Sequence, residues 1–186
     1  MSSPTPRYHR IAEMFRAQTR SNGADVVPRP ATAEEVAGAE RALGCELPES
    51  YRWFQLEFGQ VPNGPVEVYS VGTPGPSESN IVGINLDERR DAYPRLPVHL
   101  IAFSDSGGGD LLCFDTSTRQ DGECQVVWWD HEGDEGQRPE RAAASFLDWL
   151  ERELRESARE SRGPHLGVLP RLYLQWIRDW MKNRRR

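Results

Sequence analysis

The sequence has few cysteines, and they form no recognisable pair. Cys45, Cys113 and Cys124 are an odd number, lie far apart and include no Cys-x-x-Cys motif. Disulfide-rich secreted domains carry an even, closely spaced set, and zinc ribbons need paired ligands. The cysteines therefore predict buried thiols in a reducing cytoplasm, and they argue against a disulfide framework and against a zinc ribbon.

Long apolar runs are also missing. A membrane-spanning helix needs roughly 18 to 20 consecutive apolar residues, and no such run occurs. The N-terminal stretch MSSPTPRYHRIAEMFRAQ lacks the continuous apolar centre of a secretory signal. The mean hydropathy is −0.70 over 186 residues. We therefore expect a cytoplasmic protein without a membrane span.

Charge is divided unevenly along the chain. Residues 1–160 carry 16 basic and 28 acidic side chains, a net charge of −12, whereas residues 161–186 carry seven basic and one acidic side chain, a net charge of +6. An acidic surface repels the phosphate backbone of nucleic acid. The main body is therefore expected to bind no nucleic acid and to suit a basic protein partner.

Helical patterns dominate the first third of the chain. Apolar residues recur every three or four positions over 7–19, which predicts an amphipathic helix. Thr32 and Glu35 fit a capping box at the start of a second helix, and Gly44 suits its left-handed end. Residues 32–58 therefore predict a pair of helices joined by a short turn.

The middle of the chain changes to β-type patterning. Val66–Val71 alternates with period two and predicts a strand, Ile81–Ile84 is interpreted as a short strand, and Asn85–Tyr93 as a short polar helix. Three apolar runs predict neighbouring strands: Val98–Phe103, Leu111–Phe114 and Val126–Trp129. Between the first two, the glycine-rich loop Ser104–Asp110 predicts a hairpin turn that needs positive φ.

The chain ends with two helical patterns. Residues 140–156 carry an apolar stripe at helical spacing, and residues 171–186 predict a basic amphipathic helix. The order of helices, strands and helix predicts an α+β fold with a mostly antiparallel sheet flanked by helices. We divide the chain into an N-terminal helix and linker (1–30), a central domain (31–158), and a linker with the C-terminal helix (159–186).

Three groups of residues, in this order, resemble the SMI1/KNR4 domain of the SUKH superfamily. The first runs from Glu34 to Gly59 and contains LPESYR. The second, from Phe103 to Asp115, contains FSD, GGD and CFD, and the third joins VWWDHE to ASFLDWL. The resemblance covers about residues 30–155. Two departures are the sequence after Gly59, where the family commonly has Asn-Gly, and the basic tryptophan-containing helix after residue 160.

The resemblance implies an α+β domain with a non-enzymatic role. Bacterial members of the family are often immunity proteins that bind and neutralise toxin domains, many of them nucleases. Eukaryotic members act as regulators and scaffolds. By this resemblance the chain is expected to be a protein-binding module, with a basic toxin domain as its partner and no cofactor.

One alternative is a metal-dependent hydrolase that uses Asp105, Asp110 and His131. The glycine loop is followed by a strand, whereas a phosphate cradle needs a helix there, and no Lys-Ser/Thr follows the glycines. His9, His99 and His165 have no ligand-like spacing, and no G-x-S-x-G motif occurs. We therefore predict no catalytic residue and no metal site, and interpret the aspartates as turn residues.

The predicted partner-binding residues follow the last strand. Trp128 and Trp129 are adjacent, so on a strand they face opposite ways: at least one belongs to the core, and the other is either covered or an anchor for a partner. An acidic set continues from them, and on a basic partner it would speed association. The full prediction is Trp128, Trp129, Asp130, Glu132, Asp134 and Glu135.

The C-terminal helix has three interpretations. It docks its apolar face on the domain, it mediates self-association, or it lies on an anionic membrane surface through Arg184–Arg186. Docking within one chain or between two is favoured, because so many large apolar residues are poorly accommodated in water.

Overall fold

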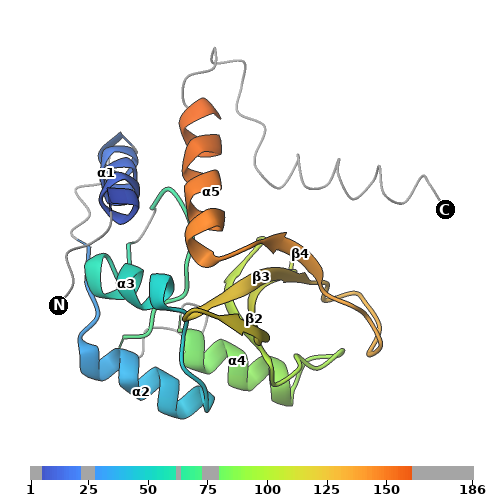
Figure 1. Cartoon of the computed structure of the whole chain (residues 1–186). Coiled ribbons are helices and arrows are strands. Elements are labelled where there is room, and N and C mark those ends of the chain that lie inside the picture. The colour runs from blue at the N-terminus through green and yellow to red at the C-terminus, as the bar shows by residue number, and fades with distance from the viewer. Residues whose placement is uncertain (1–5, 22–27, 62–63, 73–79, 161–186) are drawn as a thin grey trace.

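The computed structural model describes residues 6–21, 28–61, 64–72 and 80–160, which hold five helices and four strands. They are α1 (Pro6–Ser21), α2 (Ala33–Leu43), α3 (Glu49–Glu57), α4 (Ile81–Arg90), β1 (Leu100–Asp105), β2 (Leu111–Gln120), β3 (Glu123–Trp129), β4 (Glu140–Ala143) and α5 (Phe146–Glu160). In Figure 1, α5 lies above the sheet and α4 below it. The predicted α+β class is confirmed.

The helix pair forms as its sequence predicts. The Thr32 hydroxyl accepts a hydrogen bond from the Glu35 backbone N–H at 3.2 Å, and the Glu35 carboxylate accepts from the Thr32 N–H at 2.8 Å. Gly44 ends α2 with a φ of 72°, in the left-handed region that favours glycine. These local signals position α3, which carries large apolar side chains into the core.

The four strands form one antiparallel sheet in the order β1-β2-β3-β4. The loop between β1 and β2 is the predicted hairpin turn, closed by the Ser106 N–H donating to the Asp110 carbonyl at 2.9 Å. Gly107 and Gly109 both have positive φ there. Because β1 and β3 end where β2 and β4 begin, the loops at these positions share one end of the sheet.

The core is rich in aromatic rings. Phe15 of α1 contacts Phe54 of α3 edge to face, with ring centroids 5.3 Å apart, and Phe146 of α5 contacts Tyr51 of α3 at the same centroid distance. Other rings join them: Phe103 and Phe114 from the sheet and Trp149 from α5. Burying such side chains contributes roughly 1.5–3 kcal/mol each. Helix α1 therefore belongs to the same core as the sheet.

Three sequence-based predictions were wrong in their type of element. Val66–Val71 forms no strand, because its buried residues make only single main-chain contacts with the rest of the fold, such as the Tyr69 N–H with the Phe103 carbonyl. Ile81–Ile84 is the first turn of α4, because the Asn80 side chain accepts from the N–H groups of residues 82 and 83. The polar helix predicted at residue 85 therefore begins four residues earlier.

The third error concerns the start of the last described helix. Residues 140–143 pair with β3 as β4, and α5 begins at Phe146. The Ser145 hydroxyl accepts from the Asp148 N–H at 3.2 Å and so caps the helix after the strand. The predicted helix over 171–186 lies outside the described residues. Among the helices that the structure describes, none has the length and apolar character needed to cross a membrane.

Candidate protein-binding surface

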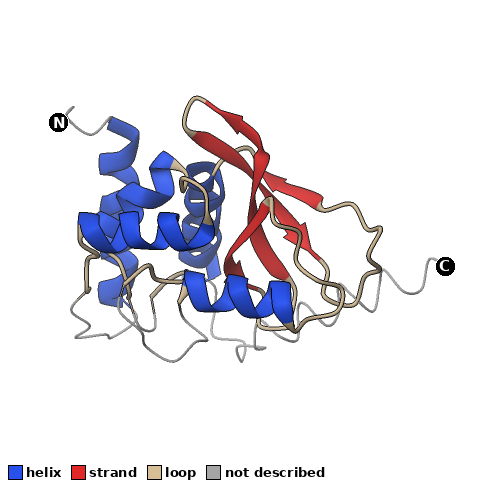
Figure 2. Ribbon diagram, turned by 90° about the horizontal axis from the view of Figure 1, so that it is seen from below, coloured by secondary structure: helices blue, strands red, loops and turns tan. Residues whose placement is uncertain are grey.

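Carboxylates gather at the end of the sheet where β1 and β3 finish. In the strand register, Asp105 is opposite Leu111, which is opposite Trp129, and the neighbouring Trp128 is opposite Glu140. The seven carboxylates at this end, here named the acidic end, are Asp105, Asp110, Asp130, Glu132, Asp134, Glu135 and Glu140. In Figure 2 the strands and their long loops extend away from most of the helices.

A histidine and an aspartate connect two loops of the acidic end. The Nδ1 atom of His131 lies 2.9 Å from Oδ1 of Asp110, and the same oxygen accepts from the His131 backbone N–H at 3.3 Å. The hydrogen bond to Asp110 raises the pKa of His131. The imidazole packs on Gly109, where an added Cβ would lie 2.8 Å from the ring. The hairpin loop therefore holds the β3–β4 loop in place.

The β3–β4 loop is also braced from within. The Gln137 side chain donates to the Asp130 carbonyl at 2.8 Å and accepts from the Asp130 N–H at 3.3 Å. Asp130 and Asp134 each accept from a backbone N–H two residues onward, both at 2.8 Å. Such bonds fix the backbone without neutralising its carboxylates. The loop therefore holds its backbone and the carboxylates of Asp130 and Asp134 in one arrangement.

Positive charge is scarce at the acidic end. Within the described residues, His131 is the only cationic partner of these carboxylates. It pairs with Asp110 and with Glu132, and the Glu132 side chain is 83% exposed. Arg138 is the one arginine in the loop between β3 and β4. On α4, burial raises the pKa of Glu88, and the His131 charge opposes this shift. Among the described residues, acidic side chains therefore outnumber basic ones at this end.

The two adjacent tryptophans separate as the strand geometry requires. Trp129 is 2% exposed and belongs to the core, so it supports β3 and offers no contact surface. Trp128 is half-buried and packs against the edge of the core. We therefore keep Trp128 and the carboxylates in the candidate surface and leave Trp129 out of it.

A second group of carboxylates, between α1 and α5, is neutralised by arginines. Between α1 and α5, Glu151 is 5% exposed and accepts from Arg7 at 3.0 Å and from Arg10 at 2.7 Å, and it also pairs with Arg155. Asp148 accepts from Arg7 at 2.6 Å. We name these five residues the arginine clasp. Burial opposes ionisation of Asp148 and Glu151, but the hydrogen bonds and charges of the arginines outweigh it and lower both pKa values.

The residues of the hydrolase alternative are only partly brought together. Asp110, Asp130 and His131 each place a ligand atom within 4.8 Å of the others. Asp105 instead accepts from the Tyr69 hydroxyl at 3.0 Å and from the Gly107 N–H at 2.7 Å. The three grouped residues are exposed or half-buried and hold backbone turns. A hydrolytic centre usually lies in a concave, largely apolar pocket, whereas Asp130 and His131 are exposed on a loop.

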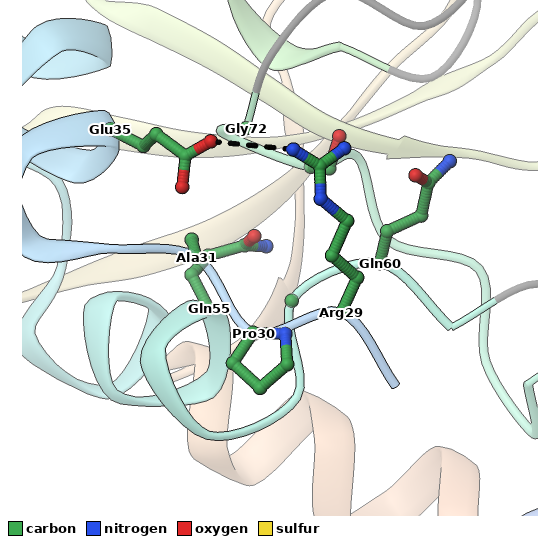
Figure 3. A pocket seen from close by; sticks show the side chains of 9 residues that line it. Arg29, Pro30, Ala31, Glu35, Gln55, Gln60 and Gly72 are labelled. Atoms are coloured by element: carbon green, nitrogen blue, oxygen red, sulfur yellow. Dashed lines mark ion pairs between the residues drawn. The ribbon is translucent and has the colours of Figure 1, made fainter. Parts of the chain in front are cut away.

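A small cavity lies apart from this end, between the start of α2 and the end of α3. Figure 3 shows its lining, which includes Arg29, Glu35, Gln55 and Gln60. Its enclosed space is about 10 Å³, room for one water molecule at most. The Arg29 guanidinium faces Glu35 across it at 3.7 Å. The cavity is therefore too small for a substrate.

Sequence reasoning missed three features of these regions. It did not predict the bond between Asp110 and His131, which are 21 positions apart, nor the bracing of Asp130 by Gln137. It also missed Glu151, which the sequence pattern placed beside Arg155 alone. Only the last had a usable signal, because an acidic residue on the apolar side of a helix implies partners from another element.

Comparison with known proteins identifies the family. The family model described as SUKH_5, SMI1-KNR4 cell-wall, matches residues 9–155, so the chain belongs to this family. The fold is similar to the crystal structure of a protein from Pseudomonas syringae pv. tomato, with a TM-score of 0.55 and 20% identity, covering 77% of this chain and 95% of that one. Family membership supports a non-catalytic domain that serves protein interactions.

Proposed function

We propose that this chain binds a basic protein through the acidic end of its sheet, with Trp128 as an apolar contact beside the charges. The observation that carries the proposal is the set of exposed carboxylates that the fold holds in place without neutralising them. Their field steers a positively charged partner and raises its association rate. Their fixed backbone lowers the entropy lost on binding.

We further propose that the chain acts as an immunity protein that neutralises a cognate toxin in the cytoplasm. The resemblance to a family whose bacterial members often have this role supports the proposal. A toxin that acts on nucleic acid must carry a positively charged cleft, and the acidic end has the complementary charge. Covering such a cleft would block access of the nucleic acid without any catalysis by this chain.

The test compares the full chain with a triple variant, Glu132→Gln, Asp134→Asn and Glu135→Gln, as baits in cells of the source organism. We expect wild type to retain a basic protein and the triple variant to lose it. Within the part of the chain that the structure describes, these three carboxylates form no bonds with side chains of the core, so folding should be unchanged. Co-expression of the captured protein should arrest growth, and the wild-type chain should restore it.

A matched control removes the same charge elsewhere. Glu34, Glu46 and Glu156 are exposed and lie on other parts of the fold. A variant with these three changed to glutamine should still capture the partner. Equal loss of binding in both variants would mean that only net charge matters, and retention by both would remove the acidic end from the interface. A captured protein that is not toxic would contradict the immunity role alone.

A further inference from the structure

The turn between β2 and β3 consists of Asp121 and Gly122, the only Asp-Gly pair in the sequence. Gln120 is opposite Glu123 in the strand register, so the turn has two residues. Asp121 has a φ of 50° and is the one residue other than glycine with positive φ in the described part of the chain, and Gly122 follows with a φ of 79°. A tight hairpin turn favours such values, but they crowd the Cβ of an L-amino acid. The turn therefore holds an aspartate in an unfavourable backbone conformation directly before a glycine.

An aspartate in this position can react with its own main chain. The Gly122 nitrogen attacks Cγ of Asp121 and forms a C–N bond, and the protonated carboxyl group loses its hydroxyl, which leaves as water with the proton from the nitrogen. Water then adds to the cyclic imide and breaks one of its two C–N bonds. One break restores aspartate, and the other gives isoaspartate, in which the main chain runs through Cγ and the α-carboxylate is free. The reaction needs no oxidant and no other reactant, and glycine favours it because no Cβ shields the nitrogen.

The fold leaves both reacting groups accessible. Asp121 is exposed, and its carboxylate forms no hydrogen bond or ion pair within the described part of the chain. The Gly122 N–H likewise donates to no described residue. Four other aspartates differ, because each accepts a hydrogen bond from the N–H two residues onward and is followed by a residue with a side chain: Asp105, Asp115, Asp130 and Asp134. Compared with these four, Asp121 is the aspartate best placed to form the imide.

The same turn joins the sheet to α3. The Gly122 carbonyl accepts from the Glu49 N–H at 3.0 Å, and the Glu123 carboxylate accepts from the Ser50 N–H at 2.8 Å and from its hydroxyl at 2.7 Å. An isoaspartyl bond adds one atom to the main chain just before Gly122. The turn has little room for this change, because a Cβ added to Gly122 would lie 3.2 Å from Oε2 of Glu49. Isomerisation would therefore displace the acceptors that hold the first turn of α3.

We infer that Asp121 and Gly122 form a site of spontaneous isoaspartate formation in the folded protein, and that the modification releases the hairpin from the start of α3. The change requires no partner, so it is independent of the proposed function. It gives the chain a loss of local structure that depends on its age. It also exposes an α-carboxylate, the group that a carboxyl methyltransferase specific for isoaspartate would recognise.

Ageing of the full chain tests the inference. Folded protein is kept in mildly acidic buffer, and isoaspartate is then located by peptide mass spectrometry with electron-transfer fragmentation. We expect at least fivefold more isoaspartate at residue 121 than at Asp105, Asp115, Asp130 or Asp134, because each of these four is followed by a residue with a Cβ. Asp121→Glu keeps the charge but would require a larger imide ring, so it should give no product at this position.

A second variant tests the position of the Gly122 nitrogen. Asp121→Asn is also favoured in this type of turn, and its side chain loses ammonia in place of water. It should form the same imide faster than wild type in mildly alkaline buffer and give aspartate and isoaspartate with the mass gain of deamidation. An asparagine at this position that stays unchanged would contradict an accessible nitrogen.

Hydrogen exchange tests the structural consequence. In aged protein, the amides of Glu49 and Ser50 should exchange faster in proportion to the isoaspartate content, and amides of α4 should stay unchanged. Isoaspartate at residue 121 that forms only in the denatured chain, or in neither state, would overturn the site, because the turn would then protect the bond. Isoaspartate in the folded chain with unchanged exchange at Glu49 and Ser50 would contradict the release of α3.

Discussion

The arginine clasp and the acidic end use carboxylates in opposite ways. In the clasp, Glu151 is 5% exposed and pairs with Arg7 and Arg10, which join α1 to α5, and with Arg155 of its own helix. At the acidic end, Asp130 and Asp134 accept hydrogen bonds from backbone N–H groups of their own loop. The clasp neutralises its charge, whereas the acidic end fixes the position of its charge and leaves it exposed.

This difference separates stability from recognition. A buried carboxylate needs its ion partners, because an uncompensated charge in the interior is costly. An exposed, unpaired carboxylate contributes little to folding, and a cluster of such charges raises repulsion, so carboxylates such as Glu132 and Glu135 add little to the stability of the fold. Charges that are held in place without a stabilising role are the ones that another molecule can use.

The largest effect on stability is expected at the clasp. Glu151→Gln removes the charge that Arg7, Arg10 and Arg155 share, and should lower the free energy of unfolding by about 2–3 kcal/mol. The arginines keep part of their hydration, which limits the loss. Chemical denaturation at pH 7 measures it. Glu135→Gln at the acidic end is the control and should change stability by less than about 0.5 kcal/mol.

The stability loss of Glu151→Gln should also depend on pH. The lowered pKa values of Asp148 and Glu151 mean that their stabilisation is fully present above the unfolded value of about 4 and is lost as the pH falls through the folded values. The difference in unfolding free energy between wild type and Glu151→Gln should therefore shrink below pH 4. A difference that stays constant down to pH 2 would contradict the ionic origin of the clasp.

A smaller effect is expected from the brace of the acidic end. Gln137→Ala removes both hydrogen bonds to the Asp130 backbone and should cost about 1 kcal/mol. Hydrogen exchange should become faster for amides of residues 130–137 and stay unchanged in α1. Partner association should slow as well, because the loop then loses more entropy on binding. Unchanged exchange in the loop would show that Gln137 does not hold it.

The smallest effect belongs to the pair of Asp110 and His131. The pKa of His131 is raised in the folded protein. The charged pair therefore stabilises the fold fully below the unfolded His pKa of about 6.5, and this stabilisation is lost as the pH rises through the pKa of His131 in the folded state. His131→Gln should therefore lower the free energy of unfolding at pH 6 by at most about 1 kcal/mol. Above the pKa of folded His131 the loss should be smaller still. In an Asp110→Asn background, this pH-dependent difference should disappear.

Local signals in the sequence were sufficient for most of the fold. The capping box of Thr32 and Glu35 and the left-handed Gly44 specify α2 because they act within a few residues. Val66–Val71 misled for a physical reason: its sequence alternates, but Tyr69, Ser70 and Val71 are all buried, and the Gln55 side chain takes up main-chain groups of Tyr69 and Val71 that a strand would pair. Residues 140–143 were assigned to a helix because their pairing with β3 depends on a strand elsewhere in the chain.

The candidate surface was predictable in composition but not in geometry. The acidic run after Trp129 is visible in the sequence, and the period of two places the neighbouring tryptophans on opposite faces. Which tryptophan is buried depends on the register with β2, where Trp129 is opposite Leu111. The contact of Asp110 with His131 depends on both hairpin geometry and the close approach at Gly109, which no single-sequence pattern encodes.

The most direct measurement is the association rate of the captured basic protein with the full chain at several salt concentrations. We expect the wild-type rate to fall at least tenfold between about 0.02 and 0.5 M salt, and the triple variant to associate at least tenfold more slowly at low salt with unchanged unfolding free energy. A rate that depends neither on salt nor on Glu132, Asp134 and Glu135 would contradict binding through the acidic end.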